Sequence, residues 1–310
     1  MVLSRNEPFI ELSLKSIESL ADEIIVVDAS RGRWAEETEK ICEEEPKIRY
    51  LHTTADYREQ TKIGLLETAK RWVLKWDADF IAFPHVMELR KLTESLERTK
   101  HYAISFPVQN LEWNFFYTNL SKPLHYEPYL FTYSFKLLKK RLIKYYNIIA
   151  LKFKKALPNR DAYTPFPFWY NNIRMNKTYA LHLNTIKPPM RLVEKQFQAK
   201  WALMSRKQKG RMTFEQFVKR SLVETQMTPE EVYLSLLKTQ KVRLYRGMYP
   251  ELLKRWIEEK LGIKFEKSVD FNSRLKDYLI KISRLTDNEI YDFTLFHPKH
   301  EKLQVIDYSI

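Results

Sequence analysis

The chain has 310 residues, enough for one large domain or two modest ones, and 44% of them are hydrophobic. This content is well above that of chains that stay unfolded, so we expect a folded protein. The single cysteine, Cys42, excludes an internal disulfide and any cysteine-based zinc or iron–sulfur site. No apolar run approaches the ~20 residues that span a bilayer, and the N-terminus lacks the apolar core of a signal peptide. We therefore expect a cytoplasmic protein, and peripheral contact with the inner face of the membrane stays open.

The formal net charge of +14 is unevenly distributed. Residues 1–99 hold 15 Lys and Arg against 20 Asp and Glu, whereas residues 100–310 hold 38 against 19. The first third is therefore net −5 and the remainder +19. A nucleic-acid binder does not usually keep its positive charge out of one third of the chain, whereas an enzyme with separate donor and acceptor regions can. Nucleic acid is thus not the expected partner.

The first hundred residues alternate between short β-branched runs and longer amphipathic runs, which is typical of an α/β unit with a mostly parallel sheet. Strands are predicted at Met1–Leu3, Glu23–Asp28, Ile48–His52, Trp72–Trp76 and Tyr102–Phe106. Helices are predicted at 9–20, 34–44, 57–70 and 86–98. Ligands of such sheets bind beyond the carboxyl ends of the strands, so the polar residues that follow each strand are the candidates for a site.

The rest of the chain changes character. From 107 to 170 the pattern is aromatic and irregular, and within it Lys136–Arg160 holds nine Lys and Arg and no acidic residue. Apolar residues recur there at helical spacing, which predicts a basic amphipathic helix at 136–156. The segment 136–160 fits either a solvated helix face or a site for an anionic membrane surface or a polyprenyl phosphate. A strand is predicted at Thr178–Asn184, and the remainder is expected to be helical, with one helix starting at a capping box of Thr228 and Glu231.

Two carboxylates, Asp77 and Asp79, follow the apolar run WVLKW at the end of the fourth predicted strand. Separated by one residue, they can both reach one cation from a turn. Mg²⁺ and Mn²⁺ prefer oxygen ligands and commonly bridge carboxylates to substrate phosphates. Asp-x-Asp also arises by chance, and acidic residues at strand ends often only cap helices or aid solubility. Its position at the sheet edge is what favours a metal site.

A further carboxylate, Asp28, ends the run IIVVD at the same predicted edge. Such a group can bond a ribose hydroxyl or a base edge, or it can cap the next helix. The chain has no Gly-x-Gly-x-x-Gly and no Gly-x-x-x-x-Gly-Lys, which argues against a dinucleotide cofactor and a P-loop.

Four ordered blocks within residues 1–110 resemble family 2 glycosyltransferases: MVLSRNEPFIELSLKSI, ADEIIVVDAS, ADYREQTKIGLLETA and WVLKWDADF. The resemblance implies the GT-A fold, a Rossmann-like, mostly parallel sheet flanked by helices, here with a helical C-terminal extension. Residues 1–190 would form the glycosyltransferase domain, with a nucleotide-sugar half at 1–106 and an acceptor half at 107–190. Residues 191–310 would form a mainly helical region.

The resemblance also implies roles for residues of both halves. His182, in ALHLNTIKPPMR, matches a histidine that family members commonly place near the metal, although a histidine in an apolar strand is often only a core residue. Arg31-Gly32-Arg33 departs from the usual Ser-x-Asp-x-Thr, so the nucleotide is not assigned. Mn²⁺ or Mg²⁺ would be bound by Asp77, Asp79 and His182, with Lys187 and Arg191 available for phosphate charge. The nucleotide sugar would be contacted by Arg5, Asn6, Glu7, Asp28, Lys62 and Asp77, with Gly64 near the donor.

An inverting transferase needs a carboxylate to deprotonate the acceptor hydroxyl. The spacing in similar enzymes indicates Asp161, with Glu127 and Glu112 as alternatives. The predicted activity is metal-dependent transfer of a sugar from a nucleotide-diphosphate donor to a glycan or polyprenyl-linked acceptor. Two alternatives stay open: a sugar-phosphate nucleotidyltransferase on a similar scaffold, and a non-enzymatic nucleic-acid-binding protein that uses the basic region.

Overall fold

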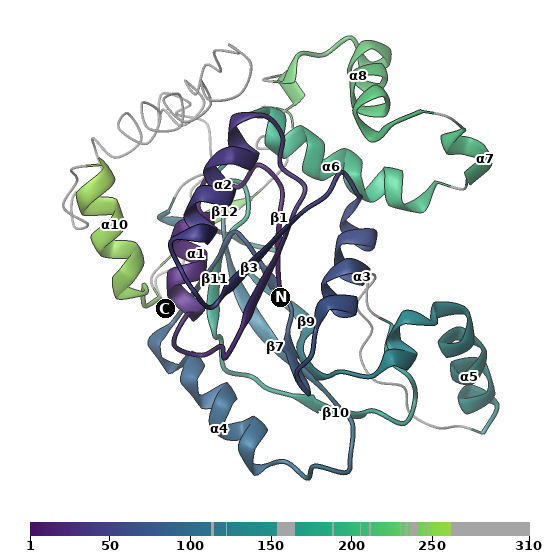
Figure 1. Cartoon of the computed structure of the whole chain (residues 1–310). Helices are drawn as coiled ribbons and strands as arrows, with labels where there is room; N and C mark the ends of the chain where they lie inside the picture. Colours follow the sequence, from purple (N-terminus) through teal and green to yellow (C-terminus); the bar gives the residue numbers. More distant parts are fainter. Residues whose placement is uncertain are drawn as a thin grey trace.

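The computed structural model describes residues 1–261 except 113–114, 122, 154–164, 188, 205, 211, 230, 233–234, 236–240 and 246. Sheets lie at its centre and helices pack around them (Figure 1). The first sheet has the strand order β3-β2-β1-β5, and its pairings are all parallel. Its strands are β1 (Val2–Ser4), β2 (Ile24–Asp28), β3 (Ile48–His52) and β5 (Trp76–Asp77). The predicted α/β class with a parallel sheet flanked by helices is confirmed.

Three helices connect the strands of this sheet: α1 (Ile10–Ile17), α2 (Arg33–Glu43) and α3 (Tyr57–Glu67). α3 begins at Asp56, whose side chain accepts a hydrogen bond from the Glu59 amide at 3.1 Å, so the sequence sets this start by an N-cap. Gly64 lets α3 lie close to β1, since a Cβ there would be 2.2 Å from the Met1 sulfur. Helix α3 therefore packs closely against one face of the parallel sheet.

A second, mixed sheet has the order β4-β9-β7-β11-β6, and β10 pairs with β7 outside this path. β7 pairs antiparallel with β9 but parallel with β10 and β11. A short antiparallel pair, β8 (Tyr117–Asn119) with β12 (Val242–Leu244), accompanies it. The strands of the mixed sheet are β4 (Trp72–Leu74), β6 (Phe80–Ala82), β7 (Tyr102–Leu111), β9 (Leu124–Thr132), β10 (Asn171–Arg174) and β11 (Ala180–Leu183).

The single strand predicted at Trp72–Trp76 is wrong, because the chain crosses from one sheet to the other there. β4 pairs with β9, whereas β5 pairs with β1. At the break, the Lys75 amide donates to the Tyr129 carbonyl at 2.7 Å and the Trp76 amide donates to the Met1 carbonyl at 2.9 Å. The apolar run is continuous in sequence because both sheets bury it, so hydrophobicity alone does not reveal the crossing.

The segment 107–170, for which the irregular pattern predicted no strand, contains the end of β7 and all of β8 and β9. The four residues Tyr129–Thr132 of β9 are all buried. A strand buried on both faces has no alternation of polar and apolar residues, which is why the pattern did not predict it.

The remaining helices follow strands of the mixed sheet along the chain or belong to the C-terminal part. α4 (Met87–Ser95) follows the short 3₁₀ turn η1 (Pro84–Val86), and α5 (Lys140–Lys152) follows η2 (Phe135–Leu138). The predicted basic helix is thus confirmed over Lys140–Lys152, and its predicted continuation over 154–156 lies outside the described residues. Figure 1 shows α5 at the periphery of the molecule, and its Ile143 belongs to a buried cluster with strand residues such as Ala103 and Phe131. The other helices are α6 (Pro189–Leu203), α7 (Arg206–Lys209), α8 (Phe214–Thr225) and α10 (Glu251–Leu261).

The C-terminal part is mainly helical over its described residues, as predicted, apart from the strand β12. The capping box is confirmed: the Glu231 amide donates to Thr228 Oγ1 at 3.2 Å and the Thr228 amide donates to Glu231 Oε2 at 2.7 Å. Within the part of the chain that the structure describes, no helix has the length and apolar character to cross a bilayer.

Candidate functional site

The carboxyl ends of β1, β2 and β5 meet at one edge of the parallel sheet. Ser4 is in register with Asp28, and Leu3 with Asp77. The turns that follow β1 and β2 are joined, because the Asn6 amide donates to Ser30 Oγ at 2.6 Å. Asn6 adopts a left-handed conformation with φ of 49°, which asparagine tolerates better than most residues. The structure therefore brings the predicted residues Asn6, Asp28 and Asp77 to the same edge.

Asp28 is fully buried beneath these turns. Its Oδ1 accepts from the amide and hydroxyl of Ser30 at 3.2 and 2.6 Å, and its Oδ2 accepts from the Tyr50 hydroxyl at 3.1 Å. Burial raises the pKa of Asp28, although these hydrogen bonds act in the opposite direction. The carboxylate thus fixes the turn after β2.

Asp79 and His182 come together because β11 runs antiparallel to β6. His182 is in register with Phe80, and the Leu183 amide donates to the Asp79 carbonyl at 2.9 Å. His182 Nε2 lies 3.0 Å from Asp79 Oδ2. On the other side of the ring, Nδ1 donates to Asn110 Oδ1 at 2.9 Å. Burial lowers the pKa of His182 to about 4, against the opposing effect of the Asp79 charge.

A group of buried charges surrounds Asp79. Lys187 is fully buried, and its Nζ lies 2.7 Å from Asp79 Oδ2 and 2.5 Å from Glu7 Oε2. Arg191 Nη2 lies 2.6 Å from Glu7 Oε1. Burial alone would raise the pKa of Asp79, but His182, Lys187 and Lys195 hold it well below its usual value. Asp79 is therefore ionised, and both Asp79 and Glu7 pair with cations from the chain that follows β11.

The ammonium of Lys195 has a distinct place within this group. Its Nζ lies 3.1 Å from each of three atoms: Asp79 Oδ2, His182 Nε2 and Asn184 Oδ1. Carboxylate and amide oxygens are ligands that Mg²⁺ and Mn²⁺ accept, and imidazole nitrogen is a common metal ligand. Within the described ranges no three His, Cys, Asp or Glu side chains gather as a metal-binding group, because the third donor here is an amide. The donor set fits a divalent cation at the point that the ammonium occupies.

Asp77 points elsewhere, although it is only two residues from Asp79. Its Oδ1 accepts a hydrogen bond from the Tyr57 hydroxyl on α3. Burial and the charge of Asp79 raise the pKa of Asp77 to about 6, despite the opposing effects of Lys75 and Tyr57. Of the three predicted metal ligands, the structure thus brings Asp79 and His182 into contact and leaves Asp77 at the adjoining turn.

Three other positions that were predicted to lie near the nucleotide sugar have different surroundings in the structure. Arg5 is buried, its Nη2 donates to the Ala55 carbonyl at 2.5 Å, and its guanidinium lies over the ring of Phe214. Lys62 is exposed and pairs with Glu59 at 2.6 Å, so it is outside the buried cluster. Gly64 packs against the start of the chain, where it serves the contact between α3 and β1.

The candidate bases also differ in their surroundings. Burial would raise the pKa of Glu127, but the charge of Lys75 and hydrogen bonds from His125 and Lys75 lower it to about 2. Glu112 is 2% exposed, and its Oε1 accepts from Asn184 Nδ2 at 2.8 Å. Burial raises the pKa of Glu112, against its hydrogen bonds and the charge of Lys195. Asp161 lies outside the described residues.

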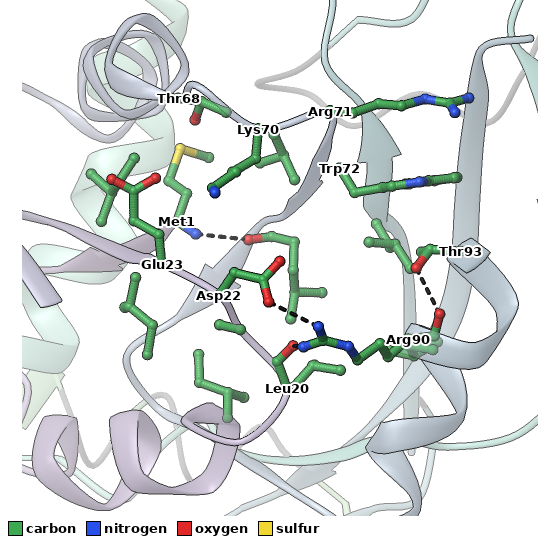
Figure 2. Close-up of a pocket in the computed structure, with 18 of the residues that line it drawn as sticks. Met1, Leu20, Asp22, Glu23, Thr68, Lys70, Arg71, Trp72, Arg90 and Thr93 are labelled. Carbon is green, nitrogen blue, oxygen red and sulfur yellow. Dashed lines mark hydrogen bonds and ion pairs between the residues drawn. The ribbon is translucent and has the colours of Figure 1, made fainter. Parts of the chain in front are cut away.

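A cavity of about 480 Å³ lies at the other end of the parallel strands, where β1 and β2 begin. Figure 2 shows Met1, whose amino group donates to the Leu74 carbonyl at 3.0 Å, and the ion pair of Arg90 with Asp22 on its wall. None of the predicted site residues lines this cavity. The polar cluster, rather than the cavity, follows the rule that ligands bind at the carboxyl ends of parallel strands.

Sequence reasoning missed Lys195, Asn184 and Tyr57. A usable signal existed for the lysine: Arg191 and Lys195 are four residues apart in a helix that follows the His182 strand, and this spacing places both side chains on one helix face. The two residues also lie beyond the predicted domain boundary at 190, so the C-terminal region contributes to the site.

A scan of protein-family models matches glycosyl transferase family 2 over residues 1–157, just over half of the chain. The chain belongs to glycosyl transferase family 2. The family resemblance predicted from the four sequence blocks is confirmed, and with it the assignment as a nucleotide-sugar-dependent glycosyltransferase. The family assignment therefore favours the glycosyltransferase over both alternatives, the nucleotidyltransferase and the nucleic-acid-binding protein.

Solved structures similar to this family 2 glycosyltransferase share little sequence with it. S. aureus TarS 1-349 is 11% identical, with 92% of this chain and 80% of that chain covered and a TM-score of 0.39. A mannosyltransferase from Pyrobaculum calidifontis, PcManGT, in complex with GDP-Man and Mn²⁺, is 15% identical, with 93% and 87% covered and a TM-score of 0.38. No curated protein sequence matches the chain.

Proposed function

We propose that this glycosyltransferase moves a sugar from a nucleotide-diphosphate donor to an acceptor hydroxyl at the edge where β1, β2 and β5 end. The observation that supports this best is the convergence of Asp79, His182 and Asn184 on one cation, here the Lys195 ammonium, beside buried Lys187 and Arg191. Nucleoside contacts are assigned to the neighbouring turns, with Asn6 after β1 and Asp77 at the end of β5, while the buried Asp28 fixes the turn after β2.

The diphosphate is assigned to the basic side of the cluster. Arg191 is 8% exposed and uses one nitrogen for Glu7, while its Nε and Nη1 have no hydrogen-bond partner among the described residues. Buried guanidinium donors suit a phosphate, because a phosphate accepts two parallel N–H hydrogen bonds. Arg5 also has an unpartnered Nε among the described residues. Both arginines therefore offer donors to an anion.

A divalent cation, Mn²⁺ or Mg²⁺, would be held by Asp79, His182 and Asn184 with Asp77 adjoining, and it would supply positive charge to the leaving diphosphate. The fully buried Lys187 keeps Asp79 ionised, and Asn110 holds His182 in the tautomer whose Nε2 is free to coordinate. The chain's own residues thus prepare two of the ligands before any substrate binds.

Replacing Asp79 with Asn tests this assignment. Without the carboxylate we expect Mn²⁺-dependent hydrolysis of the donor to fall at least about 100-fold, because a Lewis-acid cation supplies several kcal/mol of transition-state stabilisation. The measurement is nucleoside diphosphate release from a panel of nucleotide sugars with and without Mn²⁺. Asp22→Asn, at the opposite end of the strands, is the matched control and should leave turnover unchanged. Equal turnover in Asp79→Asn and wild type would refute the metal site.

Transfer with inversion requires a carboxylate that takes the proton of the acceptor hydroxyl while its oxygen attacks the anomeric carbon and the bond to the diphosphate breaks. Of the described candidates, Glu112 has the raised pKa that suits a base and lies beside Asn184, whereas Glu127 has a pKa of about 2 and is a weak base. We therefore assign the base to Glu112 in preference to Glu127, with Asp161 as the candidate outside the described residues.

Kinetics of the Gln variants separate these candidates. Glu112→Gln should lower kcat about 100-fold or more with little change in KM for the donor, the range expected for loss of a general base. Glu127→Gln should leave kcat within a few-fold of wild type. The reverse order would assign the base to Glu127, and unchanged kcat in both variants would leave Asp161→Asn as the variant that loses activity.

The acceptor is proposed to be polyprenyl-linked or at an anionic membrane surface, because of the exposed face of α5. This helix buries Ile143, Asn147 and Ala150 and turns the opposite face outward. On that outward face, Tyr145, Ile148 and Leu151 are 61%, 48% and 57% exposed, next to Arg141, Lys144 and Lys152. A helix with exposed apolar and basic residues and no acidic ones is typical of helices that lie on anionic bilayers.

A further inference from the structure

Lys195 differs from its neighbour Lys187 in how firmly the structure holds it. The Lys187 side chain is 0% exposed and is clamped between Glu7 and Asp79 at 2.5 and 2.7 Å. The Lys195 side chain is 32% exposed, and its three contacts are longer, at 3.1 Å each. A lysine whose side chain is partly exposed can withdraw its ammonium by rotation of the side chain, whereas a fully enclosed one cannot.

The three atoms around the Lys195 ammonium form a site that suits a positive ion, either an ammonium or a metal. Asp79 Oδ2 and His182 Nε2 lie only 3.0 Å apart. Lys195 Nζ lies 3.1 Å from both of these atoms and from Asn184 Oδ1, so a carboxylate oxygen, an imidazole nitrogen and an amide oxygen surround one ammonium. A carboxylate and an amide oxygen attract a positive group. Lys195 supplies that positive group in this structure.

We propose that Lys195 is a built-in cation that holds the metal position while the donor is absent, and that its ammonium leaves when the donor diphosphate offers it a new partner. This proposal rests on the proposed function, because it takes the same three atoms as the ligands of the divalent cation. Lys195 then lowers the affinity of the free protein for the divalent cation. Lys195 also couples the binding of the divalent cation to that of the donor. A bound diphosphate draws the ammonium away and so raises the affinity for the cation. By linkage, a bound cation raises the affinity for the diphosphate by the same factor.

Binding of Mn²⁺ tests this without turnover. The free ion is followed by electron paramagnetic resonance while protein is added, first alone and then with UDP or GDP. In Lys195→Met, Mn²⁺ should bind the free protein at least about tenfold more tightly than in wild type, because a like charge within a few ångströms is removed. The gain in affinity that UDP or GDP produces should be smaller in Lys195→Met than in wild type. Lys91→Met, an exposed lysine on α4, is the control and should behave as wild type.

The outcomes separate this proposal from the metal site itself. If wild type and Lys195→Met bind Mn²⁺ equally, or the variant binds it more weakly, Lys195 does not compete with the ion and the proposal is wrong, although the metal site stands. If Asp79→Asn added to Lys195→Met leaves the gained affinity intact, the ion is bound elsewhere and the proposal is again wrong. If neither wild type nor Lys195→Met binds Mn²⁺ with nucleotide present, the metal assignment fails as well. Thermal unfolding of each variant establishes that it is folded.

Discussion

Two helices of this enzyme carry clustered positive charge, and they present it in opposite ways. α6 directs Arg191 and Lys195 toward the sheet edge, where Glu7, Asp79 and His182 receive them at 2.6 to 3.1 Å. α5 exposes Arg141, Lys144 and Lys152, and none of these makes an ion pair with a described residue. Arg191 and Lys195 of α6 thus contact acidic partners in the site, whereas Arg141, Lys144 and Lys152 of α5 face solvent beside apolar side chains.

The difference shows that net charge alone says little about the partner. Burying a charge costs several kcal/mol unless it is paired, so a buried cation–carboxylate group has a fixed geometry that can recognise a compact ligand such as a diphosphate. Exposed cations keep their hydration and their freedom of movement, so they act through the summed field on a large surface. The +19 charge of residues 100–310 therefore includes two kinds of cation: buried ones in ion pairs at the site and exposed ones on α5.

Removing a cation from the α6 side should have the larger effect on stability. Lys187→Met leaves Glu7 and Asp79 buried with one partner fewer each, and breaking a buried pair costs about 3 to 5 kcal/mol. Urea unfolding followed by tryptophan fluorescence measures the change in the free energy of unfolding. We expect a loss of about 3 kcal/mol, at the low end of that range, because Arg191 still pairs with Glu7.

The matched control for this prediction is an exposed ion pair of similar length. Lys15 and Glu11 lie 2.6 Å apart on α1, with side chains 51% and 47% exposed. Lys15→Met should cost no more than about 1 kcal/mol, because water screens exposed pairs. If the two variants lose equal stability, the buried charges of the site do not hold the fold together as we describe.

The same contrast explains which parts were predictable from sequence. The edge with Asp28, Asp77 and Asp79 was found because each residue directly follows an apolar run, and parallel strands end at a common edge. The contact between Asp79 and His182 needed the antiparallel pairing of β6 with β11, residues about a hundred positions apart, which no local pattern encodes. Only the family resemblance indicated His182 in advance.

Other parts failed for related physical reasons. β9 was not predicted because its buried end lacks alternation, and the division of Trp72–Trp76 between two sheets was hidden because both sheets bury the run. The basic helix, by contrast, was predicted from its periodicity, since one of its faces is buried and the other exposed. Local amphipathicity is therefore readable in this chain, whereas the contacts between distant strands that build the site are not.

The α5 side of the comparison is tested on vesicles. The wild-type protein should sediment with phosphatidylcholine vesicles that contain phosphatidylglycerol and much less with phosphatidylcholine alone, and the binding should weaken as salt rises from 0.1 M to 1 M, where the screening length shrinks from about 10 Å to about 3 Å. Ile148→Glu with Leu151→Glu should lower partitioning at least about tenfold, since two apolar side chains worth about 1.5 kcal/mol or more each can no longer insert.

The control places the same substitution on an exposed apolar residue away from α5. Leu66, on α3, is 51% exposed, and Leu66→Glu should leave vesicle binding and the free energy of unfolding nearly unchanged. Both residues changed on α5 are also exposed, so the double variant should unfold like wild type, which separates lost membrane contact from lost structure.

Equal binding of wild type to neutral and anionic vesicles would show that the α5 cations do not contribute to membrane binding. Concentration-dependent self-association that the double variant abolishes would instead identify a second copy of the chain as the partner of this face.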